Sequence, residues 1–204
     1  MPVLELSHTR TFDAEMDQLR QRCFPGCYPT GSSKDEFDES SVHIVARADG
    51  QVAGAGRLIP RPTAFYRETF EGRVVVPDEP DVVYFGRVMV APEHRGHDLF
   101  ELVMVEGLLH ACDAGFRLVF GGMRPDRKFR PFVEVLGFKD YGDPQMGIFP
   151  EGERMDQPLI TETRGNRDRW LARKQAVLPR LRAKGYDVVD HGCAVHADSD
   201  ESNR

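Results

Sequence analysis

Hydrophobic and polar residues alternate along the chain in short blocks that predict strands and helices. Two apolar runs, residues 42–47 and 51–59, flank Asp49-Gly50, and an Asp-Gly pair between such runs is a strong β-hairpin signal. A third run, 82–91, predicts a long buried strand with a glycine inside it. A glycine in a strand often marks a bulge or the close approach of another backbone. Shorter runs predict strands at 3–6, 116–120 and 145–149.

Other stretches carry apolar residues at helical spacing. The clearest helix is predicted from Arg95 to Ala114, with Gly115 following as a terminating residue. Thr11 is the expected N-cap of a first amphipathic helix that ends near Cys23. Further helices are predicted at 65–70, 124–136 and 170–184, the last interrupted or kinked by Pro179.

The length of 204 residues fits one domain with a substantial core. We expect this domain to span residues 1–160. A C-terminal helical extension is expected at 161–190, and the polar stretch 191–204 is expected to be a disordered tail.

Composition and charge argue against several classes of protein. The net charge is −6, from 27 basic and 33 acidic residues, which argues against general nucleic-acid binding. No run of 18 apolar residues predicts a membrane span, and the first residues lack a signal-peptide pattern, so we expect a cytoplasmic protein. Four cysteines in a chain of this size do not predict a disulfide scaffold, and no four-ligand spacing predicts a metal site.

The region from Phe85 to Gly142 carries the most informative pattern. A strand there ends in a turn that opens a helix, so backbone N–H groups point outward and form a potential anion site. At this turn Gly96 permits close backbone approach and Arg95 can hold a phosphate oxygen. The alternative is that Arg95-Gly96 simply begins an ordinary helix.

The run from Val90 to Phe100 resembles the motif V-x-P-x-x-R-G-x-G-x-G of Gcn5-related N-acetyltransferases (GNATs), and Leu136-Gly137-Phe138 matches their closing L-G-F. The resemblance implies a mixed α/β fold whose mostly antiparallel central sheet is splayed at its middle and flanked by helices. It also implies a cleft for acyl-CoA, acetyl-CoA or acyl-phosphopantetheine as co-substrate, without a metal. By this resemblance, the co-substrate would contact Val88, Met89, Val90, Arg95, Gly96, His97 and Asp98.

Three positions depart from the GNAT pattern. Asp98 and Phe100 replace the second and third loop glycines, and a carboxylate at position 98 would lie unfavourably close to a pyrophosphate. Val133 stands where many members have a tyrosine that acts as general acid. These departures count against acetyl-CoA chemistry with a tyrosine acid at that position.

The N-terminal half is similar to a GNAT-like branch, the autoinducer (acyl-homoserine-lactone) synthases and related N-acyl amino acid synthases, which often use acyl-carrier protein. Four motifs of that branch occur in the expected order. They are R-x-x-x-F at Arg20 and Phe24, D-x-F-D at Asp35–Asp38, R-L-x-P at Arg57–Pro60, and E-x-x-R, where Arg87 matches and Tyr84 replaces the glutamate.

These motifs suggest catalytic and substrate-binding groups. An amine acceptor needs a base, and one with a carboxylate needs a cation nearby. The predicted catalytic residues are Asp38, Arg57, Arg87 and Tyr84, and the predicted substrate-binding residues are Arg20, Phe24 and Asp35. Either Asp38 or a water molecule takes the proton of the amine. The alternative is an Arg–Asp network that pins the N-terminal region to the sheet, and both roles can hold together.

A basic run could dock a partner. Arg124, Arg127, Lys128 and Arg130 stand at a predicted helix start, where they could contact an acidic carrier protein or the phosphate of coenzyme A. The alternative is a solvated helix face.

Three functions remain in competition. The first is an N-acyltransferase that acylates an amino acid or related small amine from acyl-CoA or acyl-carrier protein. The second is an acetyl-CoA-dependent N-acetyltransferase of small molecules or peptides. The third is a non-catalytic module that binds acyl groups or coenzyme A.

Overall fold

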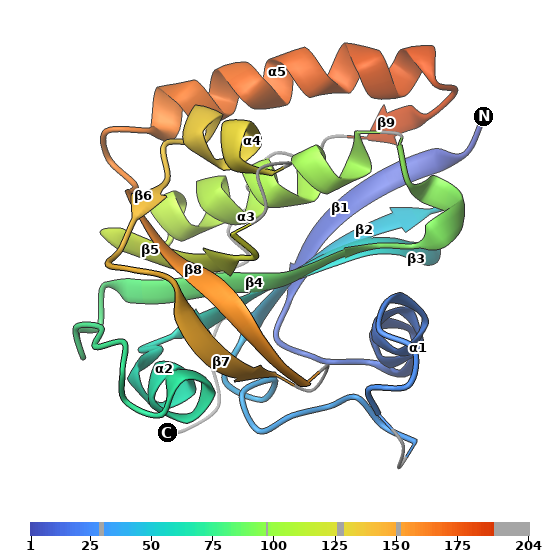
Figure 1. Ribbon diagram of the computed structural model, residues 1–204. Helices are drawn as coiled ribbons and strands as arrows, with labels where there is room; N and C mark the ends of the chain where they lie inside the picture. Colours follow the sequence, from blue (N-terminus) through green and yellow to red (C-terminus); the bar gives the residue numbers. More distant parts are fainter. Residues whose placement is uncertain (29–30, 97, 126–128, 150–151, 190–204) are drawn as a thin grey trace, which may run out of the picture.

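A mixed sheet with helices on both faces forms the body of the molecule (Figure 1). The computed structural model describes residues 1–28, 31–96, 98–125, 129–149 and 152–189. The strands are β1 (Val3–Thr9), β2 (Val42–Ala48), β3 (Gln51–Pro60), β4 (Val82–Val90), β5 (Leu118–Met123), β6 (Lys139–Asp140), β7 (Gln145–Phe149), β8 (Gly152–Glu162) and β9 (Asp187–Val189). Their order is β6-β8-β5-β4-β3-β2-β1-β9, and β7 pairs with β8.

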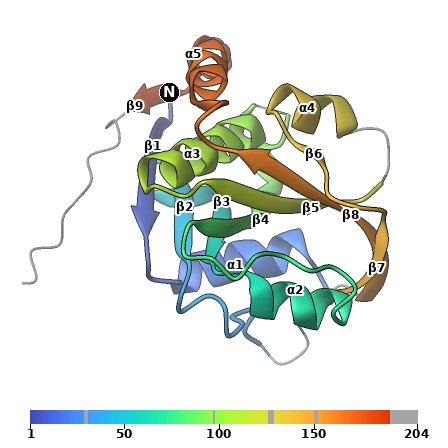
Figure 2. The ribbon, with the colours of Figure 1, turned by 90° about the vertical axis from the view of Figure 1, so that its left-hand side faces the viewer.

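The helices form layers on the two faces of the sheet. They are α1 (Ala14–Cys23), α2 (Thr63–Phe70), α3 (Leu99–Asp113), α4 (Arg130–Val135) and α5 (Arg167–Ala183), with a 3₁₀ turn at Pro92–His94. Helices α3, α4 and α5 lie on one face, α1 and α2 on the other, and α5 forms an outer layer over α3 (Figures 1 and 2).

The strand pairing confirms the fold class that the sequence predicted. In the described part of the chain the neighbouring strands are antiparallel, apart from the parallel pairs β4–β5 and β1–β9. The β4–β5 register joins Val82–Tyr84 to Leu118–Phe120. Beyond it, β4 continues to Val90 along β3, while β5 continues to Met123 along β8. The two strands therefore diverge at the middle of the sheet, which is the predicted splay.

The predicted hairpin is confirmed as β2–β3. Asp49 and Gly50 form its turn with φ angles of 49° and 80°, and positive φ at both central residues matches the right-handed twist of the flanking strands. The Asp49 carboxylate also accepts a hydrogen bond of 2.8 Å from the Val3 backbone N–H, which fixes the start of β1.

Helix α3 is apolar around most of its circumference because it is covered on two sides. One side packs on the sheet, and the other faces α5, where Lys174 pairs with Glu106 at 2.6 Å and Arg173 and Arg180 pair with Glu101. Trp170 of α5 is fully buried and donates its indole N–H to the Leu136 carbonyl at 2.8 Å. Together with the β1–β9 pairing, these contacts attach the described part of residues 161–190 to the main core.

Several predicted boundaries were wrong. Asp13, not Thr11, caps α1, because its carboxylate accepts the Met16 N–H at 2.8 Å. Helix α3 begins at Leu99 rather than Arg95, since Gly96 and Asp98 adopt positive φ angles of 74° and 64°, which a right-handed helix does not accept.

Other parts of the prediction were wrong or incomplete in the C-terminal half. Helix α4 starts at Arg130, not Arg124, with Pro131 in its first turn, a favoured place for proline. Strand β8 was missed because its charged residues and Pro158 hide the alternation of a strand. The predicted tail lies outside the described residues.

Gly107 allows α3 to lie close to β4, and we expect Gly107→Ala to destabilise the protein. A methyl group there would lie 2.2 Å from the Phe85 ring. Overpacking of this kind costs roughly 1–3 kcal/mol, which outweighs a gain in helix propensity of up to about 1 kcal/mol. Thermal denaturation should show a midpoint lowered by a few degrees. The control is Gly165→Ala, where open space surrounds the new methyl group. An unchanged midpoint for Gly107→Ala would contradict the packing argument.

Candidate active site

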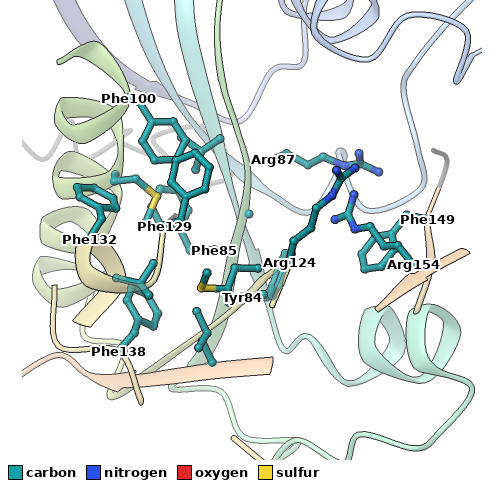
Figure 3. Close-up of a pocket in the computed structure, with 18 of the residues that line it drawn as sticks. Tyr84, Phe85, Arg87, Phe100, Arg124, Phe129, Phe132, Phe138, Phe149 and Arg154 are labelled. Carbon is teal, nitrogen blue, oxygen red and sulfur yellow. The ribbon is translucent and has the colours of Figure 1, made fainter. Parts of the chain in front are cut away.

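A cavity of about 430 Å³ opens where β4 and β5 separate (Figure 3). Its walls come from β4, the end of β5, α3, α4 and the β7–β8 pair. The cavity therefore exists because two neighbouring strands exchange partners, and residues of both strands line it.

One end of the cavity is aromatic. Figure 3 shows rings from α3, the segment before α4, α4 itself and the turn between α4 and β6 gathered on one side of β4. We define the aromatic end by the lining residues Phe85, Phe100, Phe129, Phe132 and Phe138. A surface of this kind favours a chain of methylene groups, each worth about 0.8 kcal/mol when buried.

The other end is cationic, and we define the arginine end by Arg87, Arg124 and Arg154, which line the same cavity (Figure 3). The Arg154 guanidinium lies 3.8 Å from the centroid of the Phe149 ring, and that of Arg87 lies 5.5 Å from the Phe24 centroid. Sequence reasoning found Arg87, missed Arg154 in the unrecognised strand β8, and assigned Arg124 to a docking surface.

A β-bulge in β4 lies between the two ends. Ala55 of β3 pairs with Met89 and Arg57 pairs with Gly86, so Arg87 and Val88 face a single residue of β3. Arg87 has a φ of 52°, a left-handed conformation that is costly outside glycine and gathers at functional sites. A bulge takes backbone groups out of the ladder and redirects side chains. Arg87 and Val88 both line the cavity, whereas Met89 is buried beside α1.

Tyr84 reaches the bulge across Gly86. A methyl group on Gly86 would lie 2.5 Å from the Tyr84 hydroxyl oxygen, so glycine at this position leaves room for the phenol. Both residues line the cavity. Burial and then the nearby charge of Asp156 raise the pKa of Tyr84 to about 12. The hydroxyl therefore keeps its proton at neutral pH and can donate a hydrogen bond.

Asp38 lies in a buried ion-pair network rather than among the residues that line the cavity. Arg20 donates two hydrogen bonds to its carboxylate, at 2.7 and 2.8 Å, and Arg57 donates a third at 2.7 Å. Burial alone would raise the pKa of Asp38, but the hydrogen bonds and charges of the two guanidinium groups hold it well below its usual value. Asp38 thus stays ionised and fully engaged.

The same network ties the loop before β2 to the body of the protein. Arg57 also binds Asp35 at 2.5 Å, and Arg20 donates to the Ser33 carbonyl at 2.9 Å. The structure therefore divides the residues that the autoinducer-synthase motifs singled out. Phe24, Tyr84 and Arg87 line the cavity, whereas Arg20, Asp35, Asp38 and Arg57 form the network.

The loop between β4 and α3, where the sequence suggested phosphate binding, receives cations from the end of α5. Lys184 donates to the Gly96 carbonyl at 2.8 Å and to the Asp98 carboxylate at 2.9 Å. Arg180 lies 3.4 Å from the same carboxylate. These two cations offset the charge of Asp98 that counted against an anion site. Arg95 is exposed and donates to the Val90 carbonyl at 3.3 Å, while His97 lies outside the described residues.

Within the residues that the structure describes, no group of three histidine, cysteine, aspartate or glutamate side chains is arranged to hold a metal ion. None of the helices in the described ranges combines the length and apolar character that crossing a membrane requires.

Part of the sequence is similar to a known family. Residues 9–105 match the model of the acetyltransferase (GNAT) domain. That match covers α1 through the start of α3, including the bulge and the following loop. The fold is GNAT-like, and this partial match agrees with the GNAT resemblance that the sequence motifs suggested. No curated protein matches the sequence significantly.

Solved structures share most of this fold. The CoA-dependent acyl-homoserine lactone synthase BjaI, solved with SAM and isopentyl-CoA, is 15% identical with a TM-score of 0.62 over 93% of this chain and 94% of that chain. The acyl-homoserine lactone synthase LasI is 16% identical with a TM-score of 0.63, covering 84% and 94%. A putative N-acetyltransferase from Lactobacillus plantarum is 16% identical with a TM-score of 0.55, covering 79% and 99%. At these identities the similarity concerns the fold.

Proposed function

We propose that this protein moves an acyl group from an acyl-CoA or acyl-carrier-protein thioester to the amine of an amino acid or related small molecule. The observation that carries the proposal is one cavity with an aromatic end and an arginine end, joined at the β4 bulge. The aromatic end suits an acyl chain with its pantetheine arm, and the arginine end suits a carboxylate on the acceptor. The BjaI structure, which was solved with SAM and isopentyl-CoA, offers a parallel for this pair of substrates.

In the proposed reaction the neutral amine attacks the thioester carbonyl carbon. A C–N bond forms and the carbonyl oxygen becomes an oxyanion, after which the C–S bond breaks and the oxyanion returns to a carbonyl. The amine loses one proton and the departing sulfur gains one, so the products are an amide and a thiol. Backbone groups at Val88 and the Tyr84 hydroxyl, which both line the cavity near the bulge, would bind the reacting thioester.

Asp38 has a positioning role in this scheme, because its oxygens are occupied by Arg20 and Arg57. A water molecule in the cavity accepts the proton when the amine arrives protonated. The loop at Arg95 and Gly96, with Asp98 offset by Lys184, would hold the phosphates of the donor. The phosphate site suggested by the sequence is thus kept, and Arg180 and Lys184 at the end of α5 add positive charge beside it.

A thermal-shift panel tests the proposal. Coenzyme A, acetyl-CoA, octanoyl-CoA, palmitoyl-CoA and an octanoyl-loaded acyl-carrier protein are added separately to the full chain. A ligand at one hundred times its Kd stabilises the folded state by about 2.7 kcal/mol, or roughly 5–10 °C for a chain of this size. We expect octanoyl-CoA or the acyl carrier to exceed acetyl-CoA, because the aromatic end buries the longer chain.

The control ligand is ADP, which lacks the pantetheine arm. A shift by acetyl-CoA that does not grow with chain length would favour the acetyltransferase alternative. Stabilisation without release of a free thiol in the presence of amine acceptors would favour a binding module. If no thioester donor shifts the midpoint or releases thiol, the acyltransfer proposal fails.

A further inference from the structure

The arginine end holds more guanidinium groups than a single carboxylate requires. One planar guanidinium can hold one carboxylate through two parallel hydrogen bonds. Here three guanidinium groups, from Arg87, Arg124 and Arg154, line the same cavity and are drawn together at one end of it in Figure 3. Asp156 lies 3.8 Å from Arg154 and offsets part of this charge.

Two of the three arginines are positioned by features of the fold. Arg87 sits in the bulge with a left-handed backbone, near the Phe24 ring, so its place depends on an extra residue in β4. Arg154 lies against the Phe149 ring, 3.8 Å from the ring centroid, and its side chain is 28% exposed. Stacking on an aromatic face restricts a guanidinium without cancelling its charge. Such positioning reduces the entropy that a bound anion must overcome.

The third arginine comes from a different element. Arg124 follows Met123, the last residue of β5, so it enters the cavity from the strand that diverges from β4. It is exposed to solvent, and a ligand in the cavity can reach it. The cations therefore come from β4, β8 and the residue after β5, which lets them contact separate groups of one small molecule.

This charge discriminates among amine acceptors. A sulfonium acceptor such as SAM, which is bound in the BjaI structure, would bring an additional positive charge beside three guanidinium groups. Like charges at short distance repel, and the repulsion grows where water is partly excluded. Tyr84, the neighbouring hydroxyl-bearing side chain of β4, stays neutral and does not relieve it.

We propose that the acceptor is an amino acid with a second carboxylate, of the aspartate or glutamate class, and that Arg124 and Arg154 select it. This inference rests on the proposed function, because it names the acceptor of the same cavity. One carboxylate would bind near Arg87 at the bulge, and the second would bind between Arg124 and Arg154.

Acceptor binding tests the inference without requiring turnover. Calorimetric titration compares L-glutamate with L-glutamine, and L-aspartate with L-asparagine, with and without coenzyme A. Each pair differs by one charge and has nearly the same shape. SAM is the cationic comparison. We expect at least one acid to bind about ten- to hundredfold more tightly than its amide, the range of a charge-assisted hydrogen-bond pair. We expect SAM to bind more weakly than that acid.

The variants Arg124→Gln and Arg154→Gln should each remove most of the preference for the acid over its amide. Arg130→Gln is the matched control, because Arg130 pairs with Glu134 and Asp140 outside the cavity lining. Four results would overturn the inference. Two concern the wild type: equal affinity for acid and amide, or no binding of either acid in the millimolar range. The others are tighter binding of SAM than of the acid, and an unchanged preference for the acid in both glutamine variants. Acyl transfer that proceeds on neutral or cationic acceptors would sink the inference while leaving the proposed function intact. Loss of transfer with every acceptor and donor would sink the proposed function instead.

Discussion

Asp38→Ala is expected to lower the free energy of unfolding by roughly 3–5 kcal/mol, because it leaves two buried cations without their shared partner. Arg20, Arg57 and Asp38 are each 1% exposed or less. Removing the carboxylate therefore leaves the buried Arg20 without its ion-pair partner and leaves the buried Arg57 with Asp35 alone. For a chain of this length the thermal midpoint should fall by roughly 6–20 °C, measured by circular dichroism or calorimetry.

The exposed pair Lys34–Glu39 supplies the control. Glu39 is 76% exposed and pairs with Lys34 at 3.1 Å, so Glu39→Ala removes a carboxylate from the same loop at little cost. Its midpoint should stay within about 2 °C of the wild type. If Asp38→Ala unfolds at the same temperature as Glu39→Ala, the network does not hold the loop in place.

The pH dependence of stability provides a second readout of Asp38. Its pKa is depressed in the folded protein, so the unfolded chain binds the proton more readily. The stabilisation is thus present above the unfolded value, near pH 4, and is lost as the pH falls from there toward the folded value. Between neutral pH and pH 3, denaturant titrations of Asp38→Ala should show a smaller loss of stability than the wild type. An equal loss would mean that other acids dominate acid unfolding.

The same variant tests whether Asp38 only positions other residues or acts as the catalytic base. Assayed well below its lowered midpoint, Asp38→Ala should keep measurable acyl transfer, because its carboxylate is engaged by Arg20 and Arg57 rather than lining the cavity. A complete loss of turnover in a folded variant that still binds the donor would restore Asp38 as the base.

The sheet could be predicted from the sequence where local signals agree with the tertiary structure. The Asp49-Gly50 turn and the apolar run of β4 are local. The glycine inside β4 correctly indicated a bulge, although its nearest neighbour is the Tyr84 side chain rather than another backbone. Strand β8 could not be predicted in this way, because its partners β5 and β7 stabilise a strand whose own residues are charged and include Pro158. Missing β8 also concealed Arg154, which gives the cavity one of its cations.

In the candidate site, too, local sequence signals did not specify the tertiary contacts. The autoinducer-synthase motifs selected chemically suitable residues, but a motif does not say which way a side chain points. On β3 Arg57 faces the buried Asp38, whereas on β4 the bulge redirects Arg87 into the cavity. Likewise, the unfavourable charge of Asp98 was correctly seen, but its partner Lys184 is 86 residues away and could not be paired with it by local spacing.

Tyr84→Phe is expected to lower kcat by roughly 100- to 1,000-fold with a smaller change in KM, the cost of losing one donor to a developing oxyanion. The phenol lies across Gly86 toward the bulge, and its raised pKa keeps the proton on oxygen. A phenylalanine keeps the ring and its packing against Phe65, whose centroid is 4.4 Å away, so the fold should remain intact. The measurement is steady-state thiol release with the donor and acceptor that the wild type uses best.

Two further variants distinguish the role of the Tyr84 hydroxyl from that of its ring. Tyr141→Phe makes the same chemical change at a hydroxyl that donates to the Val75 carbonyl at 2.7 Å, and Tyr141 is not among the cavity-lining residues, so kcat should stay within about twofold. Gly86→Ala should lower kcat although Tyr84 is present, since its methyl group would occupy the place of the hydroxyl. A neutral donor with a pKa of about 12 also predicts no loss of kcat from this group between pH 7 and pH 10, because deprotonation begins above that range. If Tyr84→Phe retains the wild-type kcat, the oxyanion is bound by backbone groups of the bulge alone, and the glycine at position 86 serves only the packing of the ring.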